Sequence, residues 1–259
     1  MFVWRQQLSD GPVDHPDSRP ASASQIALDW GFTGALTPDG VSRGDFLGLN
    51  LADHVGDNPA AVDANRLTLA SEMGVARSNL LFLTQVHGRD VVVADGPWPG
   101  KPPVADAVLT THPELALAVL VADCTPILLA DTAAGVVGAV HAGRAGLLRG
   151  VLPAALEAMR DLGARSIRAA IGPAVCGRCY EVPEGMRAEA AVVSPVSATV
   201  SWSGNPAIDV AAGLAEQLSA AGVSLTWVPG CTRESPRLYS YRRRARTGRT
   251  AGVVRLWQR

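Results

Sequence analysis

The stretch that decides the fold spans residues 118–150 and reads AVLVADCTPILLADTAAGVVGAVHAGRAGLLRG. It contains two apolar, β-branched runs joined by a short turn that includes Gly135. Such runs are typical of buried strands, so the sequence predicts a central pair of strands here. Cys124 stands at the polar break of the first run, and His141 stands where the second run meets a glycine-rich bend. Both side chains therefore fall at strand ends, where a rigid sheet commonly carries functional residues.

A third residue with similar placement is His87, in the segment TQVHG at the end of an earlier apolar run. Zinc and copper favour imidazole and thiolate ligands, and a catalytic zinc site uses three protein ligands and keeps a fourth position open. His87, Cys124 and His141 supply such a set. They lie far apart in the sequence, so only the fold can bring them together. The first hypothesis is a His/Cys/His metal site.

The bulk composition favours a globular protein that acts on small molecules. The 259 residues are 47% hydrophobic, which suffices for a substantial core. The chain carries 23 Lys and Arg against 24 Asp and Glu, a formal net charge of -1. A field this close to neutral gives no reason to expect nucleic acid or an anionic membrane as a partner.

The compartment follows from two further observations. Residues 1–25 contain no long apolar stretch, and no apolar run reaches the roughly 18 residues that a membrane span needs. The four cysteines are too few and too unevenly spread for a disulfide scaffold. We therefore expect a cytoplasmic protein with free or metal-bound thiols.

The remaining pattern predicts a mixed α+β chain. Residues 1–24, rich in Pro, Ser and Asp, are expected to form a mobile N-terminal arm, followed by a single domain over residues 25–259. Residues 26–50 predict short strands and turns. No GxGxxG follows a first strand and no GxxxxGK[ST] loop occurs, which argues against a doubly wound nucleotide-binding fold. Helical spacing and capping residues predict helices over 59–73, 147–162, 183–192 and 210–221. Apolar runs predict strands over 80–86, 91–94, 105–109, 115–121, 167–171, 224–228 and 251–257.

Two carboxylates lie near the candidate ligands in the sequence. Asp123 precedes Cys124, and Asp106 belongs to a short apolar segment. A metal-bound water needs an acid or base partner, which either carboxylate could supply. Alternation within a strand, however, sends Asp123 and Cys124 to opposite faces. For both carboxylates a role in the site and a role in hydrogen-bonding loop backbone stay open.

Seven segments resemble a known family. They are GVSRGDFLGLNLADHVGDNPAAVDANR, TQVHG, ADAVLT, VADCTPILLAD, GAVHAGRAGL, GPAVCGRCYEV and the C-terminal CT…LYSYRR…TGR, in this order from Gly40 onward. The sequence resembles the multicopper polyphenol oxidase (laccase-domain) family, whose members are often described as cytoplasmic purine nucleoside phosphorylases.

The resemblance implies a four-layer α/β/β/α-type sandwich with mixed β-sheets. It also implies a zinc ion, rather than copper, held by His87, Cys124 and His141. The implied activities are phosphorolysis of adenosine, inosine, guanosine and methylthioadenosine, with phosphate as co-substrate, and deamination of adenosine.

The polar residues of the matching segments are the remaining site candidates. Asp106, Asp123 and Gln85 are the candidates for catalysis. Arginine suits phosphate because its planar guanidinium donates in pairs. The candidates for binding substrate or phosphate are Arg66, Arg144, Asn50 and Arg242.

The chain also departs from the family pattern at two places. TGALTPDGVS replaces the common Thr-Arg-x-Gly-Gly-Val-Ser, so an arginine is missing upstream of Gly40. HAGRAG replaces HAGWRG, which removes a Trp and moves an Arg to position 144. Phosphate binding is therefore the inference that these departures affect most.

Two other features are less specific. Cys176-Gly-Arg-Cys179 has redox-motif spacing but lacks the strand–CxxC–helix context and a second CxxC, so two free loop thiols are expected. The basic turn over 242–249 is either a local anion site or a solvated turn.

Three other functions use the same residues. A metal-free hydrolase could use Cys124 as nucleophile with His141 or His87 as its base. A copper phenol oxidase would need several copper sites, for which the five histidines of the chain are scarce. A non-catalytic relative could keep the fold and only bind ligand, which the two departures motivate.

Overall fold

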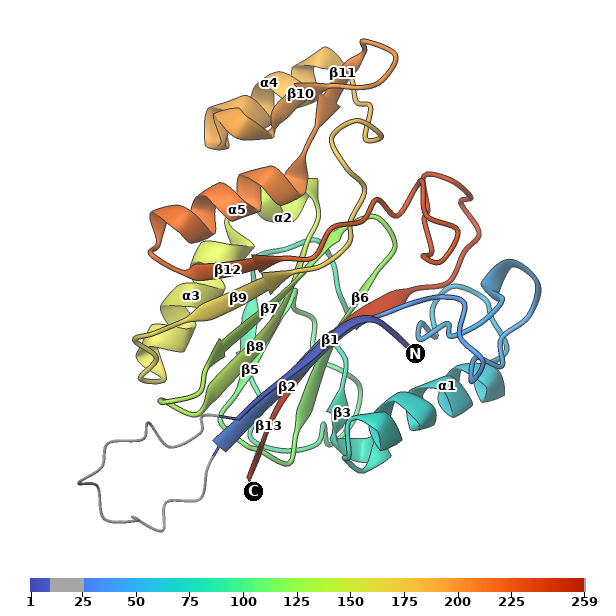
Figure 1. Ribbon diagram of the computed structural model, residues 1–259, viewed down its shortest axis with the longest axis vertical. Coiled ribbons are helices and arrows are strands. Elements are labelled where there is room, and N and C mark those ends of the chain that lie inside the picture. The colour runs from blue at the N-terminus through green and yellow to red at the C-terminus, as the bar shows by residue number, and fades with distance from the viewer. Residues whose placement is uncertain (10–25, 259) are drawn as a thin grey trace.

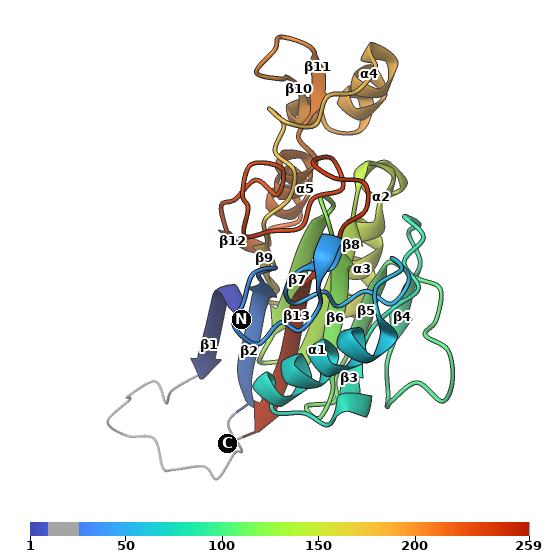
Figure 2. The same ribbon diagram turned by 90° about the vertical axis from the view of Figure 1, so that its right-hand side faces the viewer.

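The structure, a computed structural model, describes residues 1–9 and 26–258. Within these residues two β-sheets are stacked face to face, and helices cover their outer faces (Figures 1 and 2). The expected mixed α+β, four-layer sandwich is confirmed.

The first sheet has five strands in the order β1-β2-β13-β6-β3. β3 runs parallel to β6, and the other neighbours are antiparallel. Helix α1 (Pro59–Glu72) covers its outer face; the Asn58 side chain caps the helix by accepting from the Ala60 N–H at 2.9 Å. The strands are β1 (Phe2–Ser9), β2 (Ile26–Thr33), β13 (Thr250–Gln258), β6 (Ala116–Val121) and β3 (Leu80–Leu81).

The second sheet has six strands in the order β12-β9-β7-β8-β5-β4. Helices α3 (Val151–Asp161) and α5 (Val210–Ala220) cover its outer face, and short α2 (Arg144–Arg149) leads into α3. The strands are β12 (Ser224–Trp227), β9 (Arg168–Ile171), β7 (Thr125–Asp131), β8 (Val136–Ala142), β5 (Ala107–Thr110) and β4 (Val91–Val93).

A smaller unit extends beyond the end of the second sheet (Figure 1). It consists of helix α4 (Glu184–Val193) and the two-stranded sheet of β10 (Ala198–Val200) and β11 (Pro206–Ile208). Three short 3-10 helices complete the described elements, at Gly44–Phe46, Arg77–Asn79 and Pro195–Ser197.

Three hydrophobic clusters fill the spaces between the four layers. Strand alternation creates them: in β6, Leu117 and Val119 face the second sheet, whereas Ala118 and Leu120 face the α1 layer. Because both faces are covered, the strand is apolar throughout, as strands buried on both sides are. This is why residues 118–150 read as nearly continuous apolar runs.

The N-terminal segment differs from expectation. Residues 2–9, expected within a mobile arm, form β1 and pair antiparallel with β2. Trp4 packs against Trp30 and Phe32, with ring centroids 6.0 and 5.6 Å apart. The average composition of residues 1–24 hides this short aromatic strand. Residues 10–25 lie outside the described part of the chain, so the arm stays a prediction there.

The helix expected over 147–162 is divided at Gly150. This residue has φ +78, and its N–H donates to the carbonyls of Gly146 at 3.0 Å and Leu147 at 3.3 Å. A left-handed residue ends α2 and allows α3 to begin in a new direction, and glycine adopts that conformation without steric cost. Because the helix is divided, α2 can follow the end of β8 directly while α3 takes a direction of its own.

The strand expected over 80–86 is also shorter, because β3 ends at Leu81. Beyond it, the Gln85 side chain takes the place of a neighbouring strand. Its Oε1 accepts the Leu120 N–H and its Nε2 donates to the Leu120 carbonyl, both at 2.8 Å. The side-chain amide thereby satisfies the edge of β6 while the main chain turns away toward His87.

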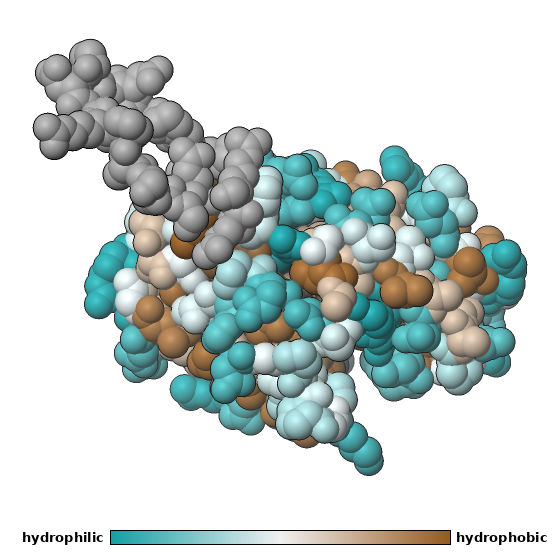
Figure 3. Space-filling model, turned by 90° about the horizontal axis from the view of Figure 1, so that it is seen from below, coloured by the Kyte–Doolittle hydropathy of each residue, from teal (hydrophilic) through white to brown (hydrophobic). Residues whose placement is uncertain are grey.

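No helix in the described ranges combines the length and hydropathy needed to cross a membrane. On the face seen in Figure 3, hydrophobic and hydrophilic residues are interspersed.

Candidate functional site

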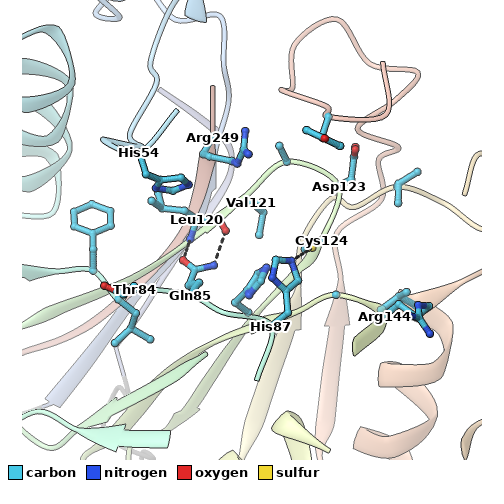
Figure 4. Close-up of a pocket in the computed structure, with 18 of the residues that line it drawn as sticks. His54, Thr84, Gln85, His87, Leu120, Val121, Asp123, Cys124, Arg144 and Arg249 are labelled. Atoms are coloured by element: carbon cyan, nitrogen blue, oxygen red, sulfur yellow. Dashed lines mark hydrogen bonds between the residues drawn. The ribbon is translucent and has the colours of Figure 1, made fainter. Parts of the chain in front are cut away.

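The fold brings His87, Cys124 and His141 together. Cys124 ends the connection between β6 and β7, and His141 lies opposite Pro126 in the β7–β8 pair. His87 reaches the same point from the segment between β3 and β4 (Figure 4). Their ligand atoms all lie within 4.8 Å of one another, and Cys124 Sγ is 3.6 Å from His87 Nε2. The three side chains form a group that could hold a metal ion.

Asp106 supports this group from behind. It is fully buried, and its Oδ1 lies 2.7 Å from His141 Nδ1. The same carboxylate accepts the backbone N–H groups of Val86 at 3.2 Å, His87 at 3.0 Å and Gly88 at 2.6 Å. A carboxylate beside Nδ1 keeps the proton there and leaves Nε2 free as a ligand. One side chain therefore orients both histidines.

The backbone around the group is specialised. His87 adopts φ +58, a left-handed conformation that is uncommon for residues other than glycine. Arg149 Nη1 donates to its carbonyl at 2.7 Å, which with Asp106 fixes the turn on both sides. A Cβ on Gly143 would lie 2.8 Å from Cys124 Sγ and 3.1 Å from His87 Cδ2. Only glycine at position 143 leaves room for the two ligands.

The charges of the group are coupled. Burial raises the pKa of the Cys124 thiol, but the charge of His141 and hydrogen bonds from both imidazoles outweigh it and lower the pKa to about 6. Burial lowers the pKa of His141, but the Cys124 thiolate and Asp106 raise it to about 9. In the protein without metal, thiolate and imidazolium therefore stabilise each other near neutral pH.

Asp123 and Gln85, the other candidates for catalysis, line the cavity beside the ligands but are engaged with the chain itself. Asp123 accepts the Thr232 hydroxyl and the Arg242 N–H, both at 2.6 Å. Gln85 pairs with Leu120 as described above (Figure 4). Both residues fix the segments that surround the cavity.

The candidate arginines differ in how far their charge is already compensated. Arg66 pairs with Asp53 at 3.2 Å and stacks on Phe82, with its guanidinium carbon 4.2 Å from the ring centroid. Arg144 pairs with Glu189 at 2.7 Å. Both residues line the cavity, and each guanidinium group is already paired with a carboxylate.

Asn50 and Arg242 are placed differently from each other. Asn50 is fully buried and does not belong to the cavity lining; its Nδ2 donates to Asp57 at 2.9 Å. Arg242 lines the cavity and stacks on Tyr180, 4.7 Å from the ring centroid. The structure thus brings Arg242 to the site and places Asn50 behind it.

Arg249 and His54 are cavity residues that were not among the sequence candidates for the site. Arg249 lines the cavity, and its Nη1 donates to the carbonyls of Thr247 and Gly248 at 2.9 and 3.0 Å. In the described part of the chain, no carboxylate forms an ion pair with it. His54 also lines the cavity, 3.6 Å from Asp53. The basic turn pointed to Arg249, but the sequence could not separate it from its solvated neighbours.

The cavity has a volume of about 600 Å³. Cys124 and His141 line it where β7 begins and β8 ends, and His87 lines it from the segment between β3 and β4. Arg249 lies on the C-terminal segment just before β13 (Figure 4). This volume is typical of a small-molecule site. The arrangement combines a three-donor group that could hold a metal ion with cations along one cavity.

A family model described as multi-copper polyphenol oxidoreductase laccase matches residues 32–257. The chain belongs to this family. Among relatives, a Streptomyces coelicolor protein named purine nucleoside phosphorylase is 53% identical over 219 residues, which cover 83% of this chain and 90% of the relative. A Deinococcus radiodurans protein of the same name is 40% identical over 243 residues, which cover 92% of each chain.

Solved structures agree with this laccase-family membership. A Neisseria meningitidis protein of family DUF152 superposes with a TM-score of 0.79 and 32% identity, covering 97% of this chain and 99% of that one. YlmD from Geobacillus stearothermophilus gives a TM-score of 0.79 and 27% identity, covering 92% and 98%. The fold shared with these solved structures therefore extends over nearly the whole chain.

Proposed function

We propose that this laccase-family chain is a zinc-dependent purine nucleoside enzyme of the cytoplasm. It would cleave adenosine, inosine, guanosine and methylthioadenosine with phosphate and would deaminate adenosine. The observation that carries the proposal is the single cavity that holds the His87, Cys124 and His141 group together with the Arg249 guanidinium, which forms no ion pair in the described residues. Relatives at 40% and 53% identity, each named purine nucleoside phosphorylase, support the substrate class.

The donor set fits zinc. Two imidazoles and one thiolate are three protein ligands of the kind that catalytic zinc sites use, with a fourth position left open. His141 Nε2 is free to bind because Nδ1 faces Asp106 at 2.7 Å. Bound by these three residues, zinc would supply Lewis-acid chemistry, which polarises a substrate atom and lowers the pKa of a water molecule.

The chain's own groups divide the remaining work. Asp106 holds the proton on His141 Nδ1, so we assign it a positioning role. Asp123 anchors the segment of Thr232 and Arg242 that forms one wall of the cavity. These contacts keep the ligands and the wall in a fixed relation, which preorganised sites need.

Phosphate would bind at Arg249. Burial lowers the pKa of this guanidinium, which means that its positive charge is incompletely solvated. An anion that pairs with it would therefore gain more than it would at an exposed arginine. Arg242 lies on the same segment and lines the same cavity, so it would add a second cation. Arg144 and Arg66 already have carboxylate partners and would contribute less.

The test is to incubate the zinc-loaded protein with adenosine or inosine, with and without phosphate, and to separate the products by chromatography. We expect free base and ribose 1-phosphate only with phosphate, and inosine from adenosine in both conditions. In Arg249→Gln the KM for phosphate should rise by about tenfold or more, while deamination stays near wild type.

Arg246→Gln is the matched control for Arg249→Gln. Arg246 belongs to the same basic turn but is exposed, lies 3.5 Å from Asp45 and does not line the cavity. Its substitution should leave both reactions unchanged. If no product forms from any nucleoside under any condition, the chain is a non-catalytic relative and the proposal is wrong.

One observation favours a second candidate, a metal-free cysteine hydrolase. The Cys124 thiol, the imidazoles around it and Asp106 behind His141 also have the order of a nucleophile, a base and an orienting acid. Metal content separates the two functions. Stoichiometric zinc that is lost in Cys124→Ala excludes the hydrolase, whereas zinc-free active protein that is inactivated by alkylation of Cys124 excludes the zinc enzyme.

A further inference from the structure

Three of the four cysteines lie outside the candidate active site and meet in one place. Cys176 and Cys179 belong to the segment between β9 and α4, and Cys231 belongs to the segment between β12 and β13. Because β9 and β12 are parallel neighbours, both segments leave the sheet at the same edge. An isolated bridge between Ala174 and Cys231 extends this pairing by one step. Sheet topology therefore places the three thiols together.

A fourth donor completes the group. The ligand atoms of Cys176, Cys179, Cys231 and Glu234 all lie within 4.8 Å of one another. Within this group Cys179 Sγ lies 3.3 Å from Glu234 Oε1. The N–H groups of Cys179 and Tyr180 both donate to the Cys176 carbonyl, at 2.9 and 3.0 Å. This turn presents the two sulfurs of the CxxC motif to the same point.

The spacing fits a tetrahedral thiophilic cation. Zinc binds sulfur at about 2.3 Å and carboxylate oxygen at about 2.0–2.2 Å, so tetrahedral ligand atoms lie about 3.5–3.8 Å apart. The observed limit of 4.8 Å requires a contraction of about 1 Å or less. Rotation of cysteine and glutamate side chains can supply that movement without a change in the backbone.

The carboxylate of the group is also available to a cation. In the described part of the chain Glu234 forms no ion pair, and its Oε1 accepts the Cys179 thiol and the Trp202 indole N–H, both at 3.3 Å. A divalent ion would take the place of the thiol protons and pair with this carboxylate.

We propose that Cys176, Cys179, Cys231 and Glu234 bind a structural zinc ion, separate from the His87, Cys124 and His141 group. Four protein donors fill the coordination of zinc, which is the pattern of structural rather than catalytic sites. A disulfide is the competing interpretation of the CxxC spacing, but it would use two sulfurs and leave the third sulfur and the carboxylate without a role.

The ion would brace one wall of the nucleoside cavity. Val175, next to Cys176, donates its N–H to the Asp123 carbonyl at 2.9 Å, and Thr232, next to Cys231, donates its hydroxyl to the Asp123 carboxylate at 2.6 Å. Both segments that carry the cysteines thus hydrogen-bond to Asp123, the residue before Cys124. Crosslinking these segments through a metal ion would hold this wall in place, whatever reaction the cavity carries out.

The test counts zinc and thiols in variants that separate the two groups. After equilibration with zinc and removal of unbound metal, elemental analysis should give about two zinc ions per wild-type chain and about one in His87→Ala/His141→Ala. Adding Cys231→Ser to that double variant should remove the remaining ion. In the cobalt-loaded double variant, sulfur-to-cobalt charge-transfer absorption should persist, and Cys231→Ser should abolish it.

Glu234→Gln provides a second test in case Cys231→Ser fails to fold, because it keeps all three sulfurs. In the His87→Ala/His141→Ala background it should release zinc to a competing chelator at least about tenfold more readily while circular dichroism stays native. The proposal is overturned if the folded double variant binds no zinc while its cysteines titrate as free thiols. It is also overturned if mass spectrometry shows a disulfide among Cys176, Cys179 and Cys231 in that variant.

Discussion

Replacing Asp106 by Asn tests the claim that one buried carboxylate orients both histidines. The asparagine Oδ1 can still accept from His87 and His141, but its NH2 group would face the N–H groups of Val86 and Gly88, which Oδ2 now accepts at 3.2 and 2.6 Å. Each N–H left without an acceptor in this buried position costs roughly 1–3 kcal/mol. For the two N–H groups together, we therefore expect Asp106→Asn to lower the free energy of unfolding by about 2–6 kcal/mol.

The same change should weaken metal binding. With Asn in place of Asp106, the carboxylate that fixes the His141 tautomer is lost, and such outer partners typically contribute about 10–100-fold in metal affinity. Zinc affinity is measured by competition with a chromophoric chelator. The affinity of the His/Cys/His group is obtained from the part of the binding curve that is absent in Cys124→Ala. Stability is measured by urea unfolding of the metal-free protein.

Asp131→Asn is the matched control for this experiment. Asp131 is also a buried carboxylate that accepts backbone N–H groups, with Oδ2 2.7 Å from both the Arg165 and Ser166 nitrogens. It lies at the end of β7 opposite the one that adjoins Cys124. Its substitution should cost similar stability and leave zinc affinity unchanged. If both variants lose stability equally and both keep wild-type zinc affinity, Asp106 is a structural residue and the reasoning fails.

Three shorter predictions follow from the same geometry. In metal-free protein, alkylation of Cys124 should reach half its maximal rate near pH 6, because the imidazoles lower the pKa of that thiol to about 6; a midpoint near pH 9 would contradict this coupling. Gly143→Ala should abolish zinc binding at the His/Cys/His group with only a modest loss of stability, because its Cβ would lie 2.8 Å from Cys124 Sγ; unchanged zinc content would show that the group can rearrange. Backbone N–H groups outweigh burial and lower the pKa of Asp131. The stabilising contribution of its carboxylate is therefore present above its usual pKa near 4, and it is lost as the pH falls toward the lower pKa of the folded protein. The urea concentration at the unfolding midpoint should therefore fall more steeply with acid in wild type than in Asp131→Asn.

The central layers could be predicted from the sequence because burial on both faces leaves a local signal. Residues 118–150 became β6, β7 and β8, with the helix that follows covering the outer face of the second sheet, as their apolar runs indicate. The candidate ligands could be predicted for a related reason. Cys124 and His141 interrupt apolar runs at strand ends, where only a functional or special structural role explains them.

Long-range contacts could not be predicted in this way. Nothing local in GPAVCGRCYEV shows that Cys231 approaches Cys176 and Cys179, because that proximity depends on the parallel pairing of β9 with β12. The pairing of Phe2–Ser9 with β2 is a similar case, in which a short aromatic strand is stabilised by Trp30 and Phe32 rather than by its own composition. In both cases the contact that determines the structure is made with residues far away in the sequence.

Whether a polar residue is free to act is decided by which backbone groups it meets, and residue type alone does not show this. Asp106, Asp123 and Gln85 have the chemistry of acids, bases and hydrogen-bonding groups, yet each is engaged with the chain itself. Arg249 has less distinctive sequence surroundings than Arg144 but, unlike Arg144, it forms no ion pair with a carboxylate in the described residues. An anionic substrate gains most where the protein has left a desolvated cation unpaired. Under the proposed function, phosphate binding does not depend on the family's HAGWRG arginine pattern, because Arg242 and Arg249 of the C-terminal segment line the cavity.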